Sequence, residues 1–129
     1  MRQVLAFLMV ALGLSIVPTV AQARVDIRID LNGQSMHVRG ADGSEYRWAI
    51  SSGRKGYRTP TGVYGSKRLA KMHFSRKYDN APMPDSIFFR GGYAIHGTNA
   101  VSRLGAPASH GCIRLAPANA AKLFAMVKQ

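Results

Sequence analysis

Three short segments near the amino terminus alternate apolar and polar residues. The first segment, 25–31, reads Val-Asp-Ile-Arg-Ile-Asp-Leu, and segments 34–39 and 46–50 repeat the same period of two. Successive side chains of a β-strand point to opposite faces, so this period predicts strands with one buried face and one exposed face. The three segments together predict a β-meander.

The links between these segments have the composition of tight turns. Asn32-Gly33 predicts a type I′ turn, because both residue types tolerate positive φ, and Asp42-Gly43 predicts a second turn. The middle segment should therefore return antiparallel to the first, with Met36 and Val38 facing the core.

The middle of the chain is rich in glycine, proline and basic residues. Thr59-Pro60-Thr61-Gly62 predicts a rigid turn that leads into an extended segment over 63–69. The segment 71–84 has no clean period and contains two prolines, so we interpret it as a long loop. Long ordered loops in small domains often line a binding cleft, and we expect 71–84 to do so.

A further hairpin and a helix complete the predicted fold. The apolar runs 87–89 and 93–95 flank Arg90-Gly91-Gly92, which predicts a hairpin whose second strand ends at His96. From Pro117 onward the apolar residues follow the helical spacing i, i+3, i+4, i+7, and proline suits the first turn of a helix. The chain is thus predicted to be mainly β, with a closed or nearly closed barrel-like sheet and a short carboxy-terminal helix.

Residues 1–23 have the layout of a cleavable secretory signal. Arg2 precedes an uncharged apolar run, Val4–Val17, and Ala21-Gln22-Ala23 supplies the small residues that signal peptidase recognises. The run is shorter than the roughly 20 residues that a membrane-spanning helix needs. We expect cleavage after Ala23, with an uncleaved anchor as the alternative. In either case the rest of the chain lies outside the cytoplasmic membrane, in the periplasm or cell wall, and after cleavage it has no stable membrane insertion.

Cleavage leaves 106 of the 129 residues, which suffices for one domain and is too short for two. We therefore expect residues 24–129 to form a single domain, and we expect a monomer. Because the chain has one cysteine, no internal disulfide supports this domain, and its stability has to come from an apolar core.

The chain is strongly basic, with 18 Lys and Arg against 6 Asp and Glu. Such a charge balance favours a polyanionic partner. Export argues against nucleic acid and favours a cell-wall polymer, with an anionic membrane surface as the second choice. Solvated basic loops without a partner are the structural alternative.

Cys112 is the only cysteine, and it lies in the run Ser109-His110-Gly111-Cys112-Ile113-Arg114. An unperturbed thiol is only a few percent ionised at neutral pH, so a cysteine nucleophile needs a base or a nearby positive charge. His96, His110 and Arg114 are candidates for both roles. We expect them to lower the pKa of the thiol.

Gly111 has a separate expected role beside the nucleophile. Without a Cβ it lets a substrate carbonyl approach the backbone, so the N–H groups around Gly111 and Cys112 are candidates for an oxyanion hole. The alternative for this run is structural: a buried inert cysteine, with Ser109 as a turn residue and the charged residues in solvent.

A metal site is the other chemistry that histidine and cysteine could support. The four histidines and Cys112 lack the short Cys-x-x-Cys or His-x-x-x-His spacing of zinc sites. We therefore expect no metal and no other cofactor.

Two motifs, in this order, carry a family resemblance. Ile95-His96-Gly97-Thr98 is followed by Leu104-Gly105 and then by Ser109-His110-Gly111-Cys112-Ile113-Arg114-Leu115, and the upstream Thr59-Pro60-Thr61-Gly62 also fits. This sequence closely resembles the L,D-transpeptidase catalytic domain, also called YkuD-like. The resemblance covers essentially all of 24–129, and it implies a β-sandwich or barrel that acts as a catalytic domain without a separate wall-binding module.

The resemblance also implies roles for individual residues. Cys112 would be the nucleophile and His96 the proton acceptor and donor, held in its tautomer by the carbonyl of Gly97. His110 and Arg114 would bind substrate and polarise the site. Backbone amides near Gly111 and Cys112 would form the oxyanion hole, and the residues that would support the site or bind substrate are Ser109, Gly97 and Thr98.

The implied substrate is the stem peptide of peptidoglycan. Cys112 would attack the carbonyl of the L-centre of the third residue of a tetrapeptide stem, release D-Ala and form a thioester that an amine acceptor resolves. Such a reaction crosslinks or remodels the cell wall and thereby affects cell shape. The acceptor stays open between another stem, a lipoprotein lysine and a free D-amino acid. Water would instead make the enzyme an L,D-carboxypeptidase or another hydrolase, and a non-enzymatic basic wall-binding protein is a further alternative.

Overall fold

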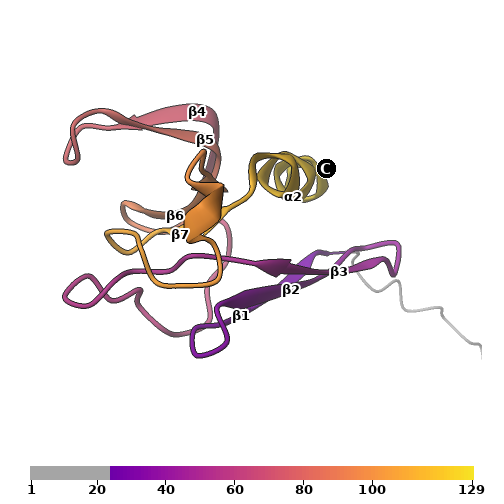
Figure 1. The fold of residues 1–129 in the computed structure, drawn as a ribbon. Coiled ribbons are helices and arrows are strands. Elements are labelled where there is room, and N and C mark those ends of the chain that lie inside the picture. The colour runs from indigo at the N-terminus through magenta and orange to yellow at the C-terminus, as the bar shows by residue number, and fades with distance from the viewer. Residues whose placement is uncertain (1–23) are drawn as a thin grey trace, which may run out of the picture.

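The predicted meander is present and forms the first of two sheets (Figure 1). In this computed structural model, which describes residues 24–129, its strands are β1 (Asp26–Asp30), β2 (Ser35–Arg39) and β3 (Glu45–Ala49). They pair antiparallel in the order β1-β2-β3. Met36 and Val38 are fully buried, which confirms the expected inward face of the middle strand. The expected secretory signal, 1–23, lies outside the described residues.

The first turn differs from the type I′ turn expected at Asn32-Gly33. Asp30 pairs with Ser35, so four residues, 31–34, make the turn, and the residue with positive φ is Gln34, at 49°. The Gln34 side chain points inward: its Nε2 donates to the Leu31 carbonyl and to the Ser52 hydroxyl, each at 2.7 Å. The prediction was wrong because the turn geometry also depends on the buried hydrogen bonds between the Gln34 side chain and Ser52, 18 residues further along the chain.

The second sheet contains the longer strands. They are β4 (Arg68–Ser75), β5 (Ala81–Arg90), β6 (Tyr93–Gly97) and β7 (Ile113–Leu115), in the order β4-β5-β6-β7. The first two pairs are antiparallel and β6–β7 is parallel. The hairpin expected around Arg90-Gly91-Gly92 is confirmed as β5–β6, and β6 ends directly after His96.

The segment 71–84, expected to be a long loop, is instead most of the β4–β5 hairpin. The two prolines misled the prediction, because proline has no N–H to donate to a sheet. Strand β5 bonds to β6 only over 87–90, so the half that contains Pro82 and Pro84 has one edge without a partner strand. The expected extended segment 63–69 is likewise displaced, since its strand begins only at Arg68.

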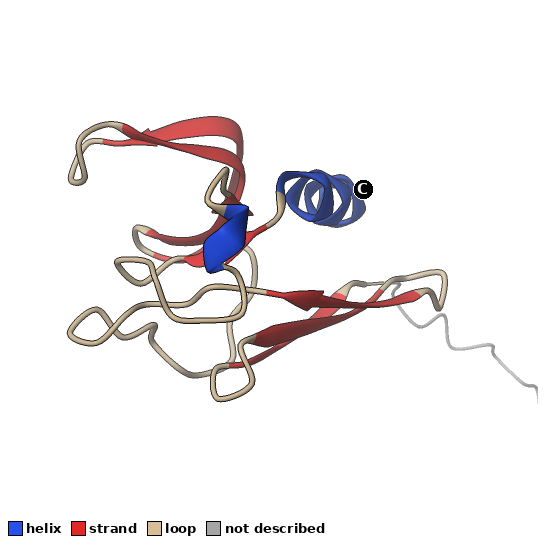
Figure 2. Ribbon diagram, viewed as in Figure 1, coloured by secondary structure: helices blue, strands red, loops and turns tan. Residues whose placement is uncertain are grey.

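Helix α2 (Pro117–Lys128) begins at the predicted proline and packs beside the second sheet (Figure 2). A single turn of 3₁₀ helix, η2 (Val101–Arg103), lies in the connection from β6 to β7. Both sheets and the helix contribute to one apolar core, whose buried members are Met36, Val38, Ile50, Ile87, Ile95, Ile113, Leu115, Ala120, Leu123 and Phe124. The mainly β fold with a carboxy-terminal helix is thus confirmed.

The two sheets do not merge into one continuous ladder; the segment after β3 joins them. Ser51 and Arg114 exchange two backbone hydrogen bonds, of 3.1 and 2.8 Å. Two residues further on, Gly53 forms a parallel bridge with Ser109. Both of these contacts involve the segment around Cys112, so the seam between the sheets holds the predicted reactive loop.

Candidate active site

The parallel pairing of β6 and β7 brings the predicted reactive residues to one face of the sheet. Ile95 pairs with Ile113, and His96 pairs with Arg114. Because side chains alternate along a strand, Cys112 faces the same side as Arg114 and His96, whereas the two isoleucines face the core. Residues far apart in sequence are therefore neighbours through strand register.

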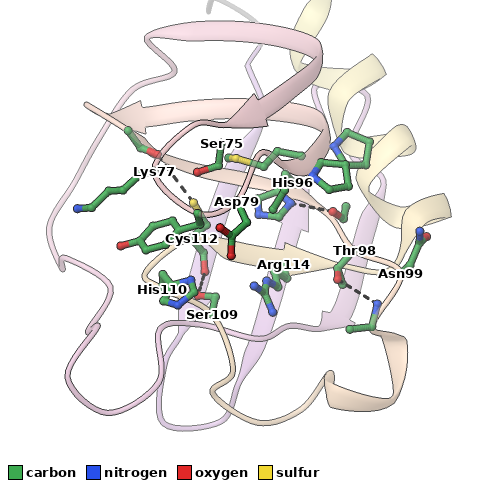
Figure 3. Close-up of a pocket in the computed structure, with 18 of the residues that line it drawn as sticks. Ser75, Lys77, Asp79, His96, Thr98, Asn99, Ser109, His110, Cys112 and Arg114 are labelled. Carbon is green, nitrogen blue, oxygen red and sulfur yellow. Dashed lines mark hydrogen bonds between the residues drawn. The ribbon is translucent and has the colours of Figure 1, made fainter.

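This face lines an open pocket of about 950 Å³, drawn in Figure 3. The β4–β5 hairpin provides another wall, as expected for the segment 71–84 even though that segment is not a loop. Seven of the predicted site residues line the pocket: His96, Gly97, Thr98, Ser109, His110, Cys112 and Arg114. Gly111, the eighth, is buried next to them without lining the pocket.

His96 is held as a neutral base. Its Nδ1 lies 2.7 Å from the carbonyl oxygen of Gly97, and since a carbonyl can only accept, Nδ1 carries the hydrogen and Nε2 keeps a free lone pair. The imidazole is 6% exposed. Burial lowers the pKa of His96 from 6.5 to about 4, against the raising effect of the Gly97 hydrogen bond and with a smaller lowering effect from the charge of Arg114. At neutral pH the ring can accept a proton.

Cys112 does not have the lowered pKa that its basic neighbours led us to expect. Burial raises the pKa of the thiol above its usual 9.0, and this effect outweighs the N–H of Ala94 and the charge of Arg114, which both lower the pKa. The side chain packs against an apolar cluster of Met83, Phe88 and Ala94. Its Sγ lies 3.9 Å from the carbonyl of Gly92. The resting thiol is therefore protonated, and a thiolate has to be generated by proton transfer.

Ser109 organises the loop before the nucleophile through both ends of its hydroxyl. The hydroxyl accepts the N–H of Gly111 at 3.0 Å and donates to the carbonyl of Cys112 at 2.6 Å. Its backbone bonds to the seam segment, accepting from Arg54 at 2.9 Å. Ser109 is 1% exposed, so these bonds are shielded from water. Since the Gly111 N–H is already occupied, it does not point freely toward the pocket.

Thr59 supports the same loop from the opposite side, a role that sequence reasoning missed. Its hydroxyl donates to the carbonyl of Gly111 at 2.8 Å and accepts the N–H of Gly53 at 2.9 Å. In a trans peptide the N–H points opposite to the C=O, so the N–H of Cys112 faces away from Thr59. The signal was available in Thr59-Pro60-Thr61-Gly62, which the sequence marks as a turn and as part of the family resemblance, without indicating what the Thr59 hydroxyl binds.

Gly111 is required by both its backbone and its surroundings. Its φ is 125°, which residues with a Cβ rarely adopt. A Cβ built at this position would lie 2.5 Å from Cε1 of Tyr93. Tyr93, which also lines the pocket, therefore packs directly on the turn that precedes the nucleophile.

His110 lies in an aromatic cluster and does not provide the positive charge expected of it. Its ring stacks on Tyr78, with centroids 3.9 Å apart and planes inclined by 6°, and meets Tyr57 edge-on at 4.8 Å. Burial and the charges of Arg54 and Arg114 lower the pKa of His110. Its Nε2 is 3.2 Å from the guanidinium of Arg54, which can only donate, so this nitrogen accepts. The ring is neutral at neutral pH.

The remaining predicted residues shape the rim of the pocket. Thr98 accepts the N–H of Ala100 at 3.0 Å through its hydroxyl, and its own N–H donates to the carbonyl of Leu115. Arg114 is half-buried, and burial lowers the pKa of its guanidinium, which nevertheless stays cationic. Its charge beside His96 makes this end of the pocket attractive to carboxylates.

Several pocket residues were not identified from the sequence. They come mainly from the tip of the β4–β5 hairpin, namely Lys77, Tyr78 and Asp79, and from Tyr93 and Asn99. For the three hairpin residues the signal was the expectation that 71–84 lines a cleft, but a segment interpreted as a loop gives no strand register, and hence no inward-facing residues.

Two kinds of feature are absent from the described residues. Within 24–129, no group of three or more His, Cys, Asp or Glu is arranged to hold a metal ion. In the same part of the chain no helix has the length and apolarity that crossing a membrane requires.

Comparison with known proteins agrees with this fold. The family model of YkuD, the L,D-transpeptidase catalytic domain, matches residues 24–129. An L,D-transpeptidase from Mycobacterium smegmatis is similar at 26% identity and a TM-score of 0.73, with 81% of this chain and 55% of that chain covered. One from Stackebrandtia nassauensis is 27% identical, at a TM-score of 0.71, with coverage of 84% and 53%. No curated protein matches the chain.

A third similar structure is an L,D-transpeptidase from Xylanimonas cellulosilytica, at 31% identity and a TM-score of 0.66, with 88% of this chain and 60% of that chain covered. The chain thus spans little more than half the length of these solved structures. The fold is mainly β, and one pocket is lined both by Cys112, which directly precedes β7, and by His96 on β6. The chain belongs to the YkuD family of L,D-transpeptidase catalytic domains.

Proposed function

We propose that residues 24–129 catalyse acyl transfer on peptidoglycan stem peptides with Cys112 as nucleophile and His96 as general base and acid. One observation carries the proposal: Cys112, directly before β7, lines the same pocket as a buried, neutral His96 on the neighbouring strand β6, whose Nδ1 is bonded to a backbone carbonyl. A buried imidazole with a free Nε2 aimed into a cleft is suited to proton transfer. Membership of the family supplies the substrate class, peptidoglycan.

The first half-reaction forms a thioester. The Cys112 thiol gives its proton to Nε2 of His96, and the sulfur attacks the carbonyl of the L-centre of the third stem residue. The N–H of Cys112 is a candidate donor to the oxyanion, since its peptide unit is turned away from Thr59. His96 then gives the proton to the nitrogen of the leaving D-Ala, and the C–N bond breaks.

The second half-reaction returns the free thiol. An amine acceptor attacks the thioester carbonyl, His96 removes a proton from the attacking nitrogen, and the C–S bond breaks as the sulfur takes that proton. Arg114 attracts a carboxylate of the stem toward this end of the pocket, and Gly97, Thr98 and Ser109 support the site. A 950 Å³ open pocket accommodates two peptide segments in sequence.

Hydrolysis by the same thiol is the second candidate, because water can replace the amine in the second half-reaction. The openness of the pocket beside Cys112 favours it. A non-enzymatic wall-binding role would use the basic surface and would not depend on the thiol. We further propose that residues 1–23 direct export and that the mature chain acts as a monomer outside the cytoplasm.

Intact-mass analysis tests the proposal directly. The protein is incubated with a tetrapeptide stem, and we expect the wild type to gain the mass of a tripeptide acyl group, whereas Cys112→Ala gains none. His96→Gln keeps the thiol but lacks the base, so its acyl mass should appear about 10² to 10⁴ times more slowly. Adding a diamine, a D-amino acid or water alone then separates transpeptidase from hydrolase by the product.

Two results would contradict the proposal. Acylation of Cys112→Ala would place the nucleophile elsewhere, and unchanged acylation of His96→Gln would remove the histidine from the reaction. Binding of both variants to purified cell-wall sacculi serves as the control, because electrostatic attachment through basic loops persists in them and weakens at high salt.

A further inference from the structure

Asp79 brings a negative charge to an otherwise basic pocket. Among residues 24–129 it is the only carboxylate that lines the pocket, whereas Lys77 and Arg114 line it with positive charge. In Figure 3 its side chain is drawn between those of Cys112, His96 and Arg114, at the open side of the pocket. A carboxylate in this position is not explained by binding of an anionic stem, which it would repel.

The carboxylate of Asp79 is not engaged by the protein. Within the described part of the chain there are four ion pairs at 4.0 Å or less, and none of them includes Asp79. The side-chain hydrogen bonds of the same residues do not include it either, although Arg114 and Lys77 line the same pocket. The group is therefore free to bind a cation that enters the pocket.

The Asp79 side chain is solvent-exposed, but the backbone that carries it is a defined turn. It lies at the tip of the β4–β5 hairpin, directly after Tyr78, which is fixed by its stack on His110. Asp79 and Asn80 both have positive φ, of 55° and 56°, a conformation that aspartate and asparagine tolerate better than other residues with a side chain. The tip is thus a defined turn joined to the catalytic loop.

The proposed reaction includes one cation that the Asp79 carboxylate could bind, the ammonium form of the acceptor. An amine acceptor reaches the thioester largely as an ammonium ion, and Arg114 and Lys77 repel it. We propose that Asp79 binds the ammonium group of the acyl acceptor and positions its nitrogen for attack on the thioester at Cys112. This inference rests on the proposed function and assigns a specificity residue to its second half-reaction.

The step balances as follows. The C–N bond forms and the C–S bond breaks; the ammonium nitrogen loses two protons and becomes the amide N–H. One proton goes to solvent as the amine is released from Asp79, and the other passes through His96 to the sulfur. Asp79 binds and positions the amine, and it makes no bond to carbon.

The test is acceptor kinetics of Asp79→Asn, with Asp26→Asn on β1 as the matched control. Asparagine keeps the shape and tolerates the positive φ, so the variant removes charge alone. With a primary diamine as acceptor, we expect KM for the acceptor to rise about three- to tenfold with little change in kcat, as for an ion pair that is partly exposed. The rate of acylation by the tetrapeptide donor, measured without acceptor, is the reference for each variant.

Hydroxylamine separates charge recognition from a general disturbance of the site. It is a nitrogen nucleophile that is uncharged at neutral pH, so its transfer rate should be the same in wild type and Asp79→Asn. Asp79→Gly, which also suits a positive φ, should behave as Asp79→Asn toward both acceptors. At a fixed concentration of diamine, the ratio of amide product to hydrolysis product should be lower in both Asp79 variants than in wild type, by the same three- to tenfold factor.

Three results would overturn the inference. An unchanged acceptor KM in Asp79→Asn would remove the carboxylate from acceptor binding, and an equal loss with hydroxylamine would make its role structural. A loss in donor acylation as large as the loss in transfer would assign it to the donor. If the wild type forms no acyl-enzyme at all, the proposed function is wrong. If the wild type forms an acyl-enzyme and Asp79→Asn transfers the acyl group to the diamine as well as the wild type does, only this inference is wrong.

Discussion

The imidazole of His110 lies face to face with the phenol ring of Tyr78, with the ring centroids 3.9 Å apart. His110 belongs to the loop before the nucleophile, and Tyr78 belongs to the tip of the β4–β5 hairpin. Stacked aromatic pairs contribute about 0.5–1.5 kcal/mol beyond their buried area. The stack therefore fastens one wall of the pocket to the loop that carries Cys112.

Tyr78→Ala should release the hairpin tip. We expect faster amide hydrogen exchange over residues 76–80 and a higher KM for the donor peptide, with the free energy of unfolding lowered by about 1 kcal/mol. Tyr78→Phe keeps the ring, so its exchange should match that of the wild type. Equal exchange in Tyr78→Ala and wild type would show that the tip is held by other contacts.

Gly111→Ala should lower the free energy of unfolding much more than the same substitution at another glycine with positive φ. Gly43, with φ of 88°, has nothing within 4 Å of an added Cβ, whereas the added Cβ at Gly111 meets Tyr93 at 2.5 Å. We expect Gly43→Ala to lower the free energy of unfolding by about 1 kcal/mol and Gly111→Ala by about 2–4 kcal/mol. Urea denaturation measures both.

The double variant Gly111→Ala with Tyr93→Ala provides the check on this prediction. It removes the clash but leaves the strained φ, so part of the stability lost in Gly111→Ala should return. If the loss in free energy of unfolding of the double variant equals or exceeds the sum of the losses of the two single variants, the contact with Tyr93 is not the cause of the instability of Gly111→Ala.

His96 should make the protein less stable in mild acid. Its folded pKa, about 4, is below the unfolded value of 6.5, so between these values the unfolded chain binds more protons. Stability is then fully present above pH 6.5 and falls as the pH decreases toward 4, by at most about 3 kcal/mol. Urea denaturation of His96→Gln over this range should show a flatter pH dependence than wild type. Equal slopes in the two proteins would mean that the imidazole is not buried as described.

Alkylation of Cys112 tests whether the resting thiol is protonated. Burial raises the pKa of this thiol. The rate of modification by iodoacetamide should therefore increase with pH along a titration curve whose midpoint lies above 9.0. The charge of Arg114 lowers this pKa, so Arg114→Gln should shift the midpoint further upward. Mass spectrometry of the modified protein measures the rates. A midpoint below 7 would instead indicate a thiolate–imidazolium pair in the free enzyme.

Local sequence patterns correctly predicted the strands and the helix that bury one face and expose the other. The alternation before residue 50 and the helical spacing after Pro117 each define one buried side, and both elements are present. The end of β6 at His96 and Gly97 was also predicted, since an apolar run gives way there to glycine. That His96 and Cys112 line one pocket depends on the parallel pairing of β6 and β7, which no local pattern contains; only the family resemblance implied that the two residues act together.

The missed features depend on contacts between distant residues. The β4–β5 hairpin exposes Met72 and buries Asp85, whose carboxylate pairs with the Lys71 ammonium at 2.7 Å. The order of apolar and polar residues in this hairpin therefore does not show which face is buried. The raised pKa of the Cys112 thiol depends on burial that only the folded chain creates. A sequence lists charged neighbours of a thiol but not the desolvation that opposes them.

Hydroxyl groups secure both carbonyls that flank the sulfur: Thr59 binds that of Gly111, and Ser109 binds that of Cys112. Neither peptide unit can rotate its oxygen toward the cleft without breaking one of these hydrogen bonds. The polarity of the backbone around the nucleophile is therefore preorganised before any ligand arrives, so little reorganisation energy is required when negative charge develops nearby.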